Sequence, residues 1–433
     1  MILAIIGGGG VRTPLLINGL FSGTSVPPDE VRLFDTDKER LRLIGRVVSA
    51  VVAHHGNRSK LVYTDNPEVA FDGADFVFSS FRQGSEAARV HDESVPLSLG
   101  ILGQETVGAG GWSMAMRTIP QALSYADTLH RYSPDAWLIN FTNPSGIVTE
   151  ALYRFSSHQR TIGICDAPVV IGRMAAQALG LPYESVAIKY FGLNHLGWAY
   201  SVMVDGVERI EEIIRFHLKE FIAAEPFYTA LENHIQETGL LPNEYLLYYL
   251  NTAKVLQSYK DSGNSRGAFI LESSKDLFKR LSDTSADPVQ AYEEYLTIRE
   301  GSYMTKESGL ARPVSQKKLF SGKKSFGYDD IALGIMNAIS TDAELSLPVI
   351  IRNGDYCPYL EADDSIEVTC NIGAAGPRVA YPAPTYPESC EKLIRLVKSY
   401  ERLTAKAALG NNEQVARLSL GANPSLRAPI LMN

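Results

Sequence analysis

The chain has 433 residues, with 41 Lys and Arg against 49 Asp and Glu, which gives a formal net charge of -8. Hydrophobic residues make up 45% and charged residues 21%, a composition that fits a folded globular protein and excludes a disordered or fibrous one. The acidic balance argues against a nucleic-acid partner. No long apolar run and no signal-peptide pattern is present, and the four cysteines lack paired spacing, so we expect no membrane segment and a reduced, cytoplasmic protein.

The first 165 residues alternate short apolar runs with amphipathic stretches. The strand candidates are 2–6, 31–35, 60–64, 75–80, 136–142 and 161–165. The clearest helical patterns lie between them, at 41–55 and 120–132. This alternation predicts a Rossmann-type, doubly wound parallel sheet.

The pattern changes after about residue 170. Helical patterns occupy 207–224, 288–300 and 390–409, and strand patterns occupy 186–193, 346–353 and 365–372. We therefore predict two domains, 1–170 and 171–433, the second a mostly helical α+β lobe with a small mixed sheet. The stretch 315–327 is rich in glycine and lysine, which favours a surface loop.

A run of glycines follows the first predicted strand and precedes a helical stretch at 13–21. In this position glycines let the backbone come close to a pyrophosphate that lies on the helix N-terminus. An acidic residue at the end of the next strand binds the ribose hydroxyls of NAD and repels the 2′-phosphate of NADP. An arginine stands where the dinucleotide motif has its third glycine, and a glycine-rich turn without a ligand is the alternative. The residues assigned to the cofactor are Gly7, Gly9, Gly10, Arg12, Thr13 and Asp35.

The segment 81–120 follows the fourth predicted strand and combines many glycines with fixed charges, Arg89 and Glu105 among them. Ligands of open α/β sheets bind at the carboxyl edge of the strands, where this segment begins. We therefore expect it to be a binding loop.

Three further polar groups follow predicted strands. Asn143 comes after 136–142, Cys165 and Asp166 end or follow 161–165, and His195 follows 186–193. A thiolate and an imidazole at one sheet edge suit a divalent metal with positions open for substrate oxygens. A buried hydrophobic cysteine and a core histidine are the simpler alternatives.

Together these motifs resemble glycoside hydrolase family 4, the NAD- and divalent-metal-dependent glycosidases that include 6-phospho-α- and 6-phospho-β-glucosidases. The resemblance covers nearly the whole chain. Its main motifs are IIGGGGVRTP (5–14), GQETVGAGG (103–111), FTNPSG (141–146), CDAP (165–168), GLNHLGW (192–198), LPNEYLLYYL (241–250) and SRG (265–267). It implies an architecture similar to that of lactate and malate dehydrogenases, and a homodimer or homotetramer.

The resemblance also implies a role for each matching residue. Cys165 and His195 match the metal ligands, usually of Mn²⁺, and Tyr245 matches the general base. Glu105 matches a carboxylate that raises the basicity of this tyrosine. Asp166 matches the position that is Asp in phospho-α-glucosidases and typically Asn in phospho-β-glucosidases. The matching substrate contacts are Arg89, Asn143 and Arg266.

In this chemistry NAD removes hydride from C3 of the sugar, the base removes the C2 proton, and the aglycone leaves C1. Water then adds to the unsaturated intermediate, and the hydride returns to C3. The net reaction is hydrolysis of a phosphorylated disaccharide or glycoside. Asp166 favours an α-linked substrate over a β-linked one, because an acid assists a poor leaving group.

One departure from the family pattern is Gly10-Val11-Arg12, which replaces a serine-containing turn. Arg12 either binds the same anion or marks a different anionic sugar. The alternatives kept open are a glycosidase of this family acting on another anionic or unphosphorylated glycoside, a net hydroxy-acid dehydrogenase, and a catalytically silent NAD or sugar-phosphate sensor.

Overall fold

The structure is a computed structural model that describes residues 1–22, 27–56, 59–312, 316–321, 327–410 and 412–426. Positions 315 and 322–326 of the predicted surface loop lie outside these ranges. The strands are β1 (Ile2–Ile6), β2 (Glu30–Phe34), β3 (Lys60–Thr64), β4 (Phe76–Ser79), β5 (Trp137–Asn140), β6 (Thr161–Gly163), β7 (Val186–Leu193), β8 (Leu196–Val204), β9 (Val207–Glu208), β10 (Leu241–Pro242), β11 (Leu345–Arg352), β12 (Ser365–Gly373) and β13 (Gly376–Val379).

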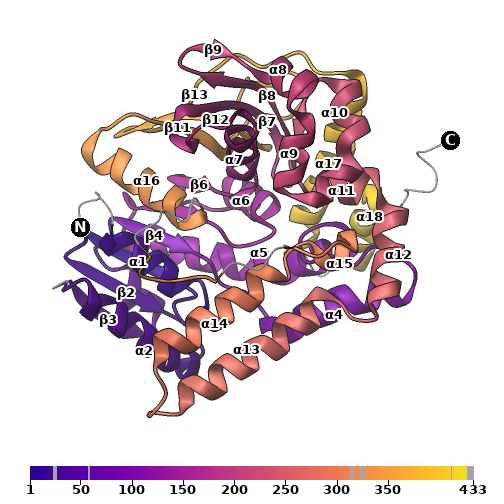
Figure 1. Ribbon diagram of the computed structural model, residues 1–433. Helices are drawn as coiled ribbons and strands as arrows, with labels where there is room; N and C mark the ends of the chain where they lie inside the picture. Colours follow the sequence, from indigo (N-terminus) through magenta and orange to yellow (C-terminus); the bar gives the residue numbers. More distant parts are fainter. Residues whose placement is uncertain (23–26, 57–58, 313–315, 322–326, 411, 427–433) are drawn as a thin grey trace.

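Within the described residues these strands form one 13-stranded sheet with the order β10-β8-β7-β12-β11-β6-β5-β4-β1-β2-β3, while β13 pairs with β12 and β9 with β8 (Figure 1). The segment from β3 to β6 is parallel throughout. Its order, 3-2-1-4-5-6, is that of the Rossmann fold, so the predicted doubly wound sheet is confirmed.

The strands of the second half extend this sheet and pair antiparallel with one another. The two halves join where Ile350 of β11 pairs with Gly163 of β6. The small sheet predicted for the second half is therefore not a sheet of its own but an extension of the parallel sheet, because the edge of that sheet at β6 accepts an antiparallel partner. The predicted division between residues 170 and 171 falls within a helix and stays a prediction.

Helices cover both faces of the sheet. Those of the first half are α1 (Thr13–Ser22), α2 (Lys38–His54), α3 (Pro67–Phe71), α4 (Ser85–Ser98), α5 (Gly108–Tyr132), α6 (Ser145–Phe155) and α7 (Ala167–Leu179). Those of the second half are α8 (Ile210–Phe216), α9 (Leu218–Ala224), α10 (Glu232–Thr238), α11 (Leu246–Leu250), α12 (Thr252–Ser262), α13 (Arg266–Ser282), α14 (Pro288–Gly301), α15 (Thr305–Ser308), α16 (Tyr328–Thr341), α17 (Glu388–Ala407) and α18 (Glu413–Gly421). Short 3₁₀ turns lie at Tyr183–Ser185, Pro226–Leu231 and Pro424–Leu426.

Two predictions about helices are wrong. The segment 81–120 is mostly helical, since α4 and the first half of α5 fill it and leave only short connections at the sheet edge. The single helix predicted at 207–224 is two helices that meet at His217, whose φ of -127° and ψ of 16° interrupt the helical path.

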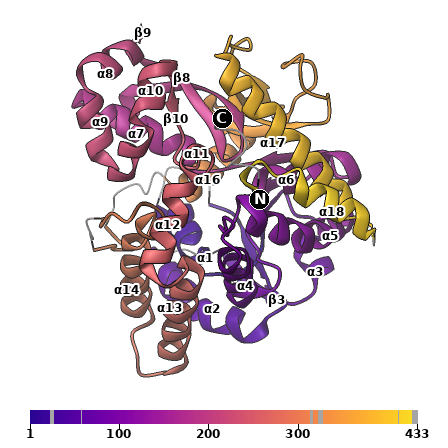
Figure 2. The same cartoon turned by 90° about the vertical axis from the view of Figure 1, so that its right-hand side faces the viewer.

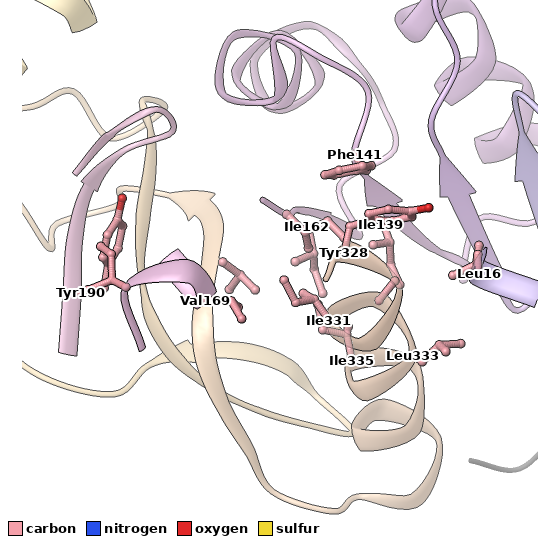
Figure 3. Close-up of a cluster of buried hydrophobic side chains, with 14 of the residues drawn as sticks. Leu16, Ile139, Phe141, Ile162, Val169, Tyr190, Tyr328, Ile331, Leu333 and Ile335 are labelled. Atoms are coloured by element: carbon pink, nitrogen blue, oxygen red, sulfur yellow. The ribbon is translucent and has the colours of Figure 1, made fainter. Parts of the chain in front are cut away.

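The core has two parts, one on each face of the sheet. One part contains Phe78 of β4 and Ile139 of β5 together with buried residues of α1, α2 and α16. On the other face α5 and α6 pack against Val77 and Leu138 of the same strands. Figure 3 shows α16 of the second half lying against β5 and β6 of the first. Alternate residues of each strand thus fix both layers.

The second half also encloses the nucleotide-binding half from the side. Helices α13 and α14 run past α2, and α17 packs against α5 and α6 (Figure 2). No helix in the described ranges is long and apolar enough to cross a membrane.

Candidate active site

The glycine turn after β1 takes the conformation that a dinucleotide site requires. Gly7 has a φ of +84°, and the Gly10 N–H donates to its carbonyl oxygen at 2.8 Å. A Cβ at Gly7 would lie 2.8 Å from the Cα of Phe81. The turn therefore depends on glycine both for its backbone angle and for its contact with the end of β4.

Asp35 lies just past the end of β2, beside this turn. Its Oδ2 accepts the Gly9 N–H at 2.9 Å and its Oδ1 accepts the Asp37 N–H at 3.0 Å. Burial raises the pKa of the Asp35 carboxyl. The neighbouring Arg40 is held by Glu86 through two hydrogen bonds of 2.7 and 3.0 Å, so its charge is already compensated.

The residues that follow the glycines are tied to helices of the second half. Tyr292 of α14 donates to the Val11 carbonyl at 2.6 Å, and Tyr328 of α16 donates to the Arg12 carbonyl at 2.9 Å. The Thr13 hydroxyl donates to the Gly7 carbonyl at 3.4 Å and so closes the turn from within.

Cys165 and Asp166 stand between β6 and α7 at the carboxyl edge of the sheet. Cys165 is 4% exposed. Burial raises the pKa of its thiol well above the ordinary value, and the charges of Glu367 and Asp166 add to the effect. The Asp166 side chain does not cap α7, although Asp166 is the N-cap residue. Its carboxylate instead acts on the neighbouring acids and tyrosines.

His195 is in the two-residue turn of the β7–β8 hairpin, with a φ of +63° that is rare for residues other than glycine. Its ring stacks on Tyr245, with centroids 3.6 Å apart and an angle of 11° between the planes. Burial lowers the pKa of His195 to about 3, so the imidazole is neutral at neutral pH.

Tyr245 directly precedes α11. Burial raises the pKa of its phenol well above 10, and the charges of Cys165, Glu244 and Asp166 raise it further. The fold thus brings together the two predicted metal ligands, the predicted base and the predicted acid from three separate segments of the chain.

Asn143 lies at the end of β5, where its Oδ1 accepts the Ser145 N–H at 3.3 Å. The adjacent start of α6 is fastened to the β7–β8 hairpin, because Asn194 accepts the Gly146 N–H at 3.1 Å. Asn143 therefore lies near His195 through a connection of only a few residues.

Arg89 and Glu105 belong to one buried ion cluster. Glu105 pairs with both Arg82 and Arg89, and Arg89 also pairs with Glu93 at 2.7 Å. Burial alone would raise the pKa of Glu105, but these two guanidinium groups outweigh burial and hold it well below its usual value. Glu93 accepts the Gly267 N–H at 2.6 Å, so the SRG segment rests on this cluster.

Arg266 stands beside a tyrosine that the sequence did not single out. Its guanidinium lies 5.0 Å from the centroid of the Tyr303 ring, and the Tyr303 hydroxyl donates to Glu244 at 2.9 Å. Glu244 is 2% exposed, and burial raises its pKa to about 7 with a further contribution from Asp166.

Glu367 on β12 is the second acid missing from the sequence predictions. It is fully buried and accepts from the side-chain amide of Asn194 at 3.4 Å. Burial raises its pKa to about 8. One signal for both acids was available, since Glu244 and Glu367 each interrupt an apolar stretch, and a buried carboxylate usually serves a site.

Within the described ranges, no three His, Cys, Asp or Glu side chains form a ready metal-binding group. Cys165 and His195 offer one sulfur and one neutral nitrogen donor, so a metal held here would keep positions open for a ligand's oxygens. The arrangement suits a dinucleotide at the glycine turn and a polar ligand beside Cys165, His195 and Tyr245.

Architecture and site together define a dinucleotide-binding enzyme. The malate dehydrogenase of Aeropyrum pernix shares the fold alone, with a TM-score of 0.55 and 13% identity over 96% of this chain and 99% of the other. The family model described as "Family 4 glycosyl hydrolase" matches residues 2–181, and its C-terminal domain model matches 190–426. The chain belongs to this family and is a glycoside hydrolase, as its motifs predicted.

Several relatives are similar over nearly their full length. A probable 6-phospho-beta-glucosidase of Bacillus subtilis is 31% identical over 98% of this chain and 91% of its own. A 6-phospho-alpha-glucosidase of Leptotrichia buccalis is 28% identical over 95% and 90%.

Two solved structures are also close in fold. The Thermotoga maritima 6-phospho-beta glucosidase with NAD and glucose-6-phosphate has a TM-score of 0.80 and 29% identity over 98% of this chain and 94% of that one. A 6-phospho-alpha-glucosidase from gut microorganisms with the same two ligands has a TM-score of 0.83 and 27% identity over 100% and 96%. A further structure of that activity and source, 25% identical, contains NAD and Mn²⁺.

Proposed function

We propose that this protein hydrolyses 6-phosphoglucosides, using NAD and a divalent metal such as Mn²⁺. The observation that carries the proposal is the meeting of Cys165, His195 and Tyr245 at the same sheet edge as the glycine turn. The relatives and solved structures named above support the substrate class, since both anomeric types act on 6-phosphorylated sugars and bind glucose-6-phosphate.

The glycine turn fits NAD. Gly7 and Gly9 leave no space for a Cβ and keep the backbone open at the sheet edge. Asp35 supplies a carboxylate for the ribose hydroxyls, and the compensated Arg40 gives no free cation to a 2′-phosphate, so NAD is favoured over NADP.

Cys165 and His195 fit a borderline divalent metal. The imidazole is in the neutral form that binds metals, and the high pKa of the thiol results from burial among negative charges that a cation would compensate. When bound, NAD would supply a hydride acceptor and donor for the sugar, and the metal would act as a Lewis acid on sugar oxygens.

The side chains of the protein supply the remaining steps. Arg89, Asn143 and Arg266 hold the sugar, and Tyr245 takes the C2 proton with Glu105 close enough for its charge to favour proton uptake. Asp166 donates a proton to the departing glycosidic oxygen. Stacking on His195 keeps the Tyr245 ring in one orientation.

The position of Asp166 also supports α-linked over β-linked substrates. Its carboxylate is not used to cap α7 and acts on Tyr245 and Glu244 within the site. A carboxyl group in this position can protonate the leaving oxygen of a sugar aglycone. This oxygen would otherwise leave as an alkoxide, which is a poorer leaving group than a phenolate.

The test is incubation of the protein with NAD⁺ and Mn²⁺ and each nitrophenyl 6-phosphoglucoside, α and β, beside the two unphosphorylated glucosides. We expect NAD-dependent release of nitrophenol from a phosphorylated compound, fastest from the α anomer, with no lasting NADH absorbance at 340 nm. Release from neither phosphorylated compound contradicts the proposal. NADH formed in proportion to the substrate consumed would indicate a net dehydrogenase.

We also propose a cytoplasmic enzyme that assembles as a homodimer or homotetramer. The four cysteines are free thiols, as in reducing compartments. Light scattering coupled to size exclusion tests the assembly against the monomer mass of 47.5 kDa.

A further inference from the structure

The departure at the cofactor turn places a guanidinium in an unusual setting. The Arg12 carbon Cζ lies 4.7 Å from the centroid of the Phe141 ring and 4.8 Å from that of Tyr328. The two rings stack on each other with centroids 4.7 Å apart and planes at 13° (Figure 3). Both aromatic residues are 5% exposed, so the guanidinium packs on two buried rings whose positions are fixed by the core.

In the described part of the chain no carboxylate forms an ion pair with Arg12, and its guanidinium donates no hydrogen bond to the protein. Its guanidinium contacts the two rings, and its backbone carbonyl accepts the Tyr328 hydroxyl at 2.9 Å and the Leu16 N–H at 3.3 Å. By contrast, Arg40 of α2 and the arginines Arg82 and Arg89 that follow β4 all pair with glutamates. Arg12 therefore keeps its whole planar set of guanidinium donors for a ligand.

Arg12 lies where the phosphate groups of either ligand could come near it. It joins the glycine turn to α1, and its side chain extends over Phe141, two residues before Asn143. Burial raises the pKa of Tyr328, and the charges of Arg12 and Asp166 act on that pKa in opposite directions. Arg12 thus lies between the dinucleotide turn and the groups assigned to the sugar.

We propose that Arg12 is a specificity-determining residue that binds a phosphate oxyanion through its guanidinium. Two ligands of the proposed reaction carry this group: the diphosphate of NAD and the 6-phosphate of the sugar. The sugar source rests on the proposed function, whereas the NAD source does not. Arginine matches phosphate with paired N–H donors, and stacking on the rings prepares the guanidinium in one plane.

The experiment measures binding directly by isothermal titration, without turnover. The probes are NAD⁺, then glucose 6-phosphate and glucose, both with NAD⁺ and Mn²⁺ present. The variants are Arg12→Met, which keeps the apolar cover over the rings, and Arg12→Lys, which keeps the charge. Arg417→Ala, which removes an arginine that is 79% exposed on α18, is the matched control for charge.

We expect Arg12→Met to weaken one phosphate ligand by roughly 10- to 100-fold, the value of a hydrogen bond to a charged group. Arg12→Lys should lose less, and Arg417→Ala nothing. Weaker binding of NAD⁺ identifies the diphosphate, while weaker binding of glucose 6-phosphate alone, with glucose unchanged, identifies the sugar. Parental affinities for both phosphate ligands in a folded Arg12→Met protein overturn the inference. A parent protein that binds NAD⁺ but no glucose 6-phosphate instead counts against the proposed function.

Discussion

Tyr245 depends on neighbours that come from separate parts of the chain. His195 from the β7–β8 turn orients its ring, while Cys165 and Asp166 from the end of β6 and Glu244 beside it set its charge environment. Burial among these groups keeps the phenol protonated in the absence of a cation. The proposed role of this tyrosine as a base therefore requires the assembled site.

Replacing Tyr245 with phenylalanine tests this role. The ring and its stacking on His195 remain, but the proton acceptor is lost, so kcat for the nitrophenyl 6-phosphoglucoside should fall by roughly 10²–10⁴-fold. Affinity for NAD⁺ should not change. Tyr63→Phe is the control, since that residue is 40% exposed on β3. A Tyr245→Phe enzyme with the kcat of the parent would show that another group takes the proton.

Motif matching reached most of these residues but not their partners. Cys165, His195 and Tyr245 were predicted because each stands in a short recognisable pattern. Glu244, Glu367 and Tyr303 act through contacts with residues far away in the chain, as when Tyr303 donates to Glu244. Such contacts form only after folding, so single-residue patterns do not show them.

At the scale of elements, periodicity located β1 to β7, β11 and β12, because alternate residues of a strand face two buried layers, but it missed β8 and the short strands β9, β10 and β13. The start of α5 was missed, since its first turn holds Gly108, Gly110 and Gly111, which indicate a loop in the sequence. A Cβ at Gly110 would lie 2.2 Å from the Gln104 carbonyl oxygen, and one at Gly111 2.3 Å from that of Thr106. Close packing of α5 against the preceding segment explains these glycines, and tertiary contact here overrides helix propensity.

The start of α13 shows the same dependence and provides a test. A Cβ at Gly267 would lie 2.8 Å from Glu93 Oε2 and 3.1 Å from Arg89 Cγ. Gly267→Ala should therefore displace this buried ion pair, lower stability by about 1–3 kcal/mol and weaken substrate binding. Thermal unfolding and KM measure the two effects. Gly421→Ala, where no atom lies within 4 Å of the new Cβ, should be neutral or stabilising. Equal behaviour of the two variants would contradict the packing argument.

At the scale of the whole molecule, the second half of the chain builds part of the nucleotide site. Tyr292 and Tyr328, on α14 and α16, donate to consecutive carbonyls of the cofactor turn. Sequence reasoning placed this turn in the first domain alone, because a side chain about 280 residues away gives no local signal. Both halves of the chain therefore contribute to the conformation of this turn.

This coupling predicts an effect on cofactor binding. Tyr292→Phe removes the hydroxyl that fixes the Val11 carbonyl, a buried hydrogen bond of 2.6 Å, while keeping the ring. Loss of about 1 kcal/mol from the ordered turn should weaken NAD⁺ binding roughly fivefold. Fluorescence titration with NAD⁺ measures this. Tyr132→Phe, at a residue 37% exposed, is the control, and an unchanged affinity in Tyr292→Phe would mean that the turn keeps its shape without this bond.

Global stability should also depend on pH through His158. Burial lowers its pKa from 6.5 to about 4, with the charge of His130 adding to the shift, so the folded protein holds the imidazole neutral while the unfolded chain takes up a proton. A histidine with a depressed pKa makes its full contribution to the free energy of unfolding above pH 6.5. This contribution declines as the pH falls toward 4. The loss of unfolding free energy that this histidine causes is on the order of 3 kcal/mol.

The variant His158→Gln tests this prediction, because its amide can donate to the Ala136 carbonyl as the ring does. It should show a smaller fall in Tm between neutral and mildly acidic pH than the parent. Substituting the exposed His91 with glutamine should leave the parental pH profile intact, and a parental profile in His158→Gln would assign the acid sensitivity to other groups.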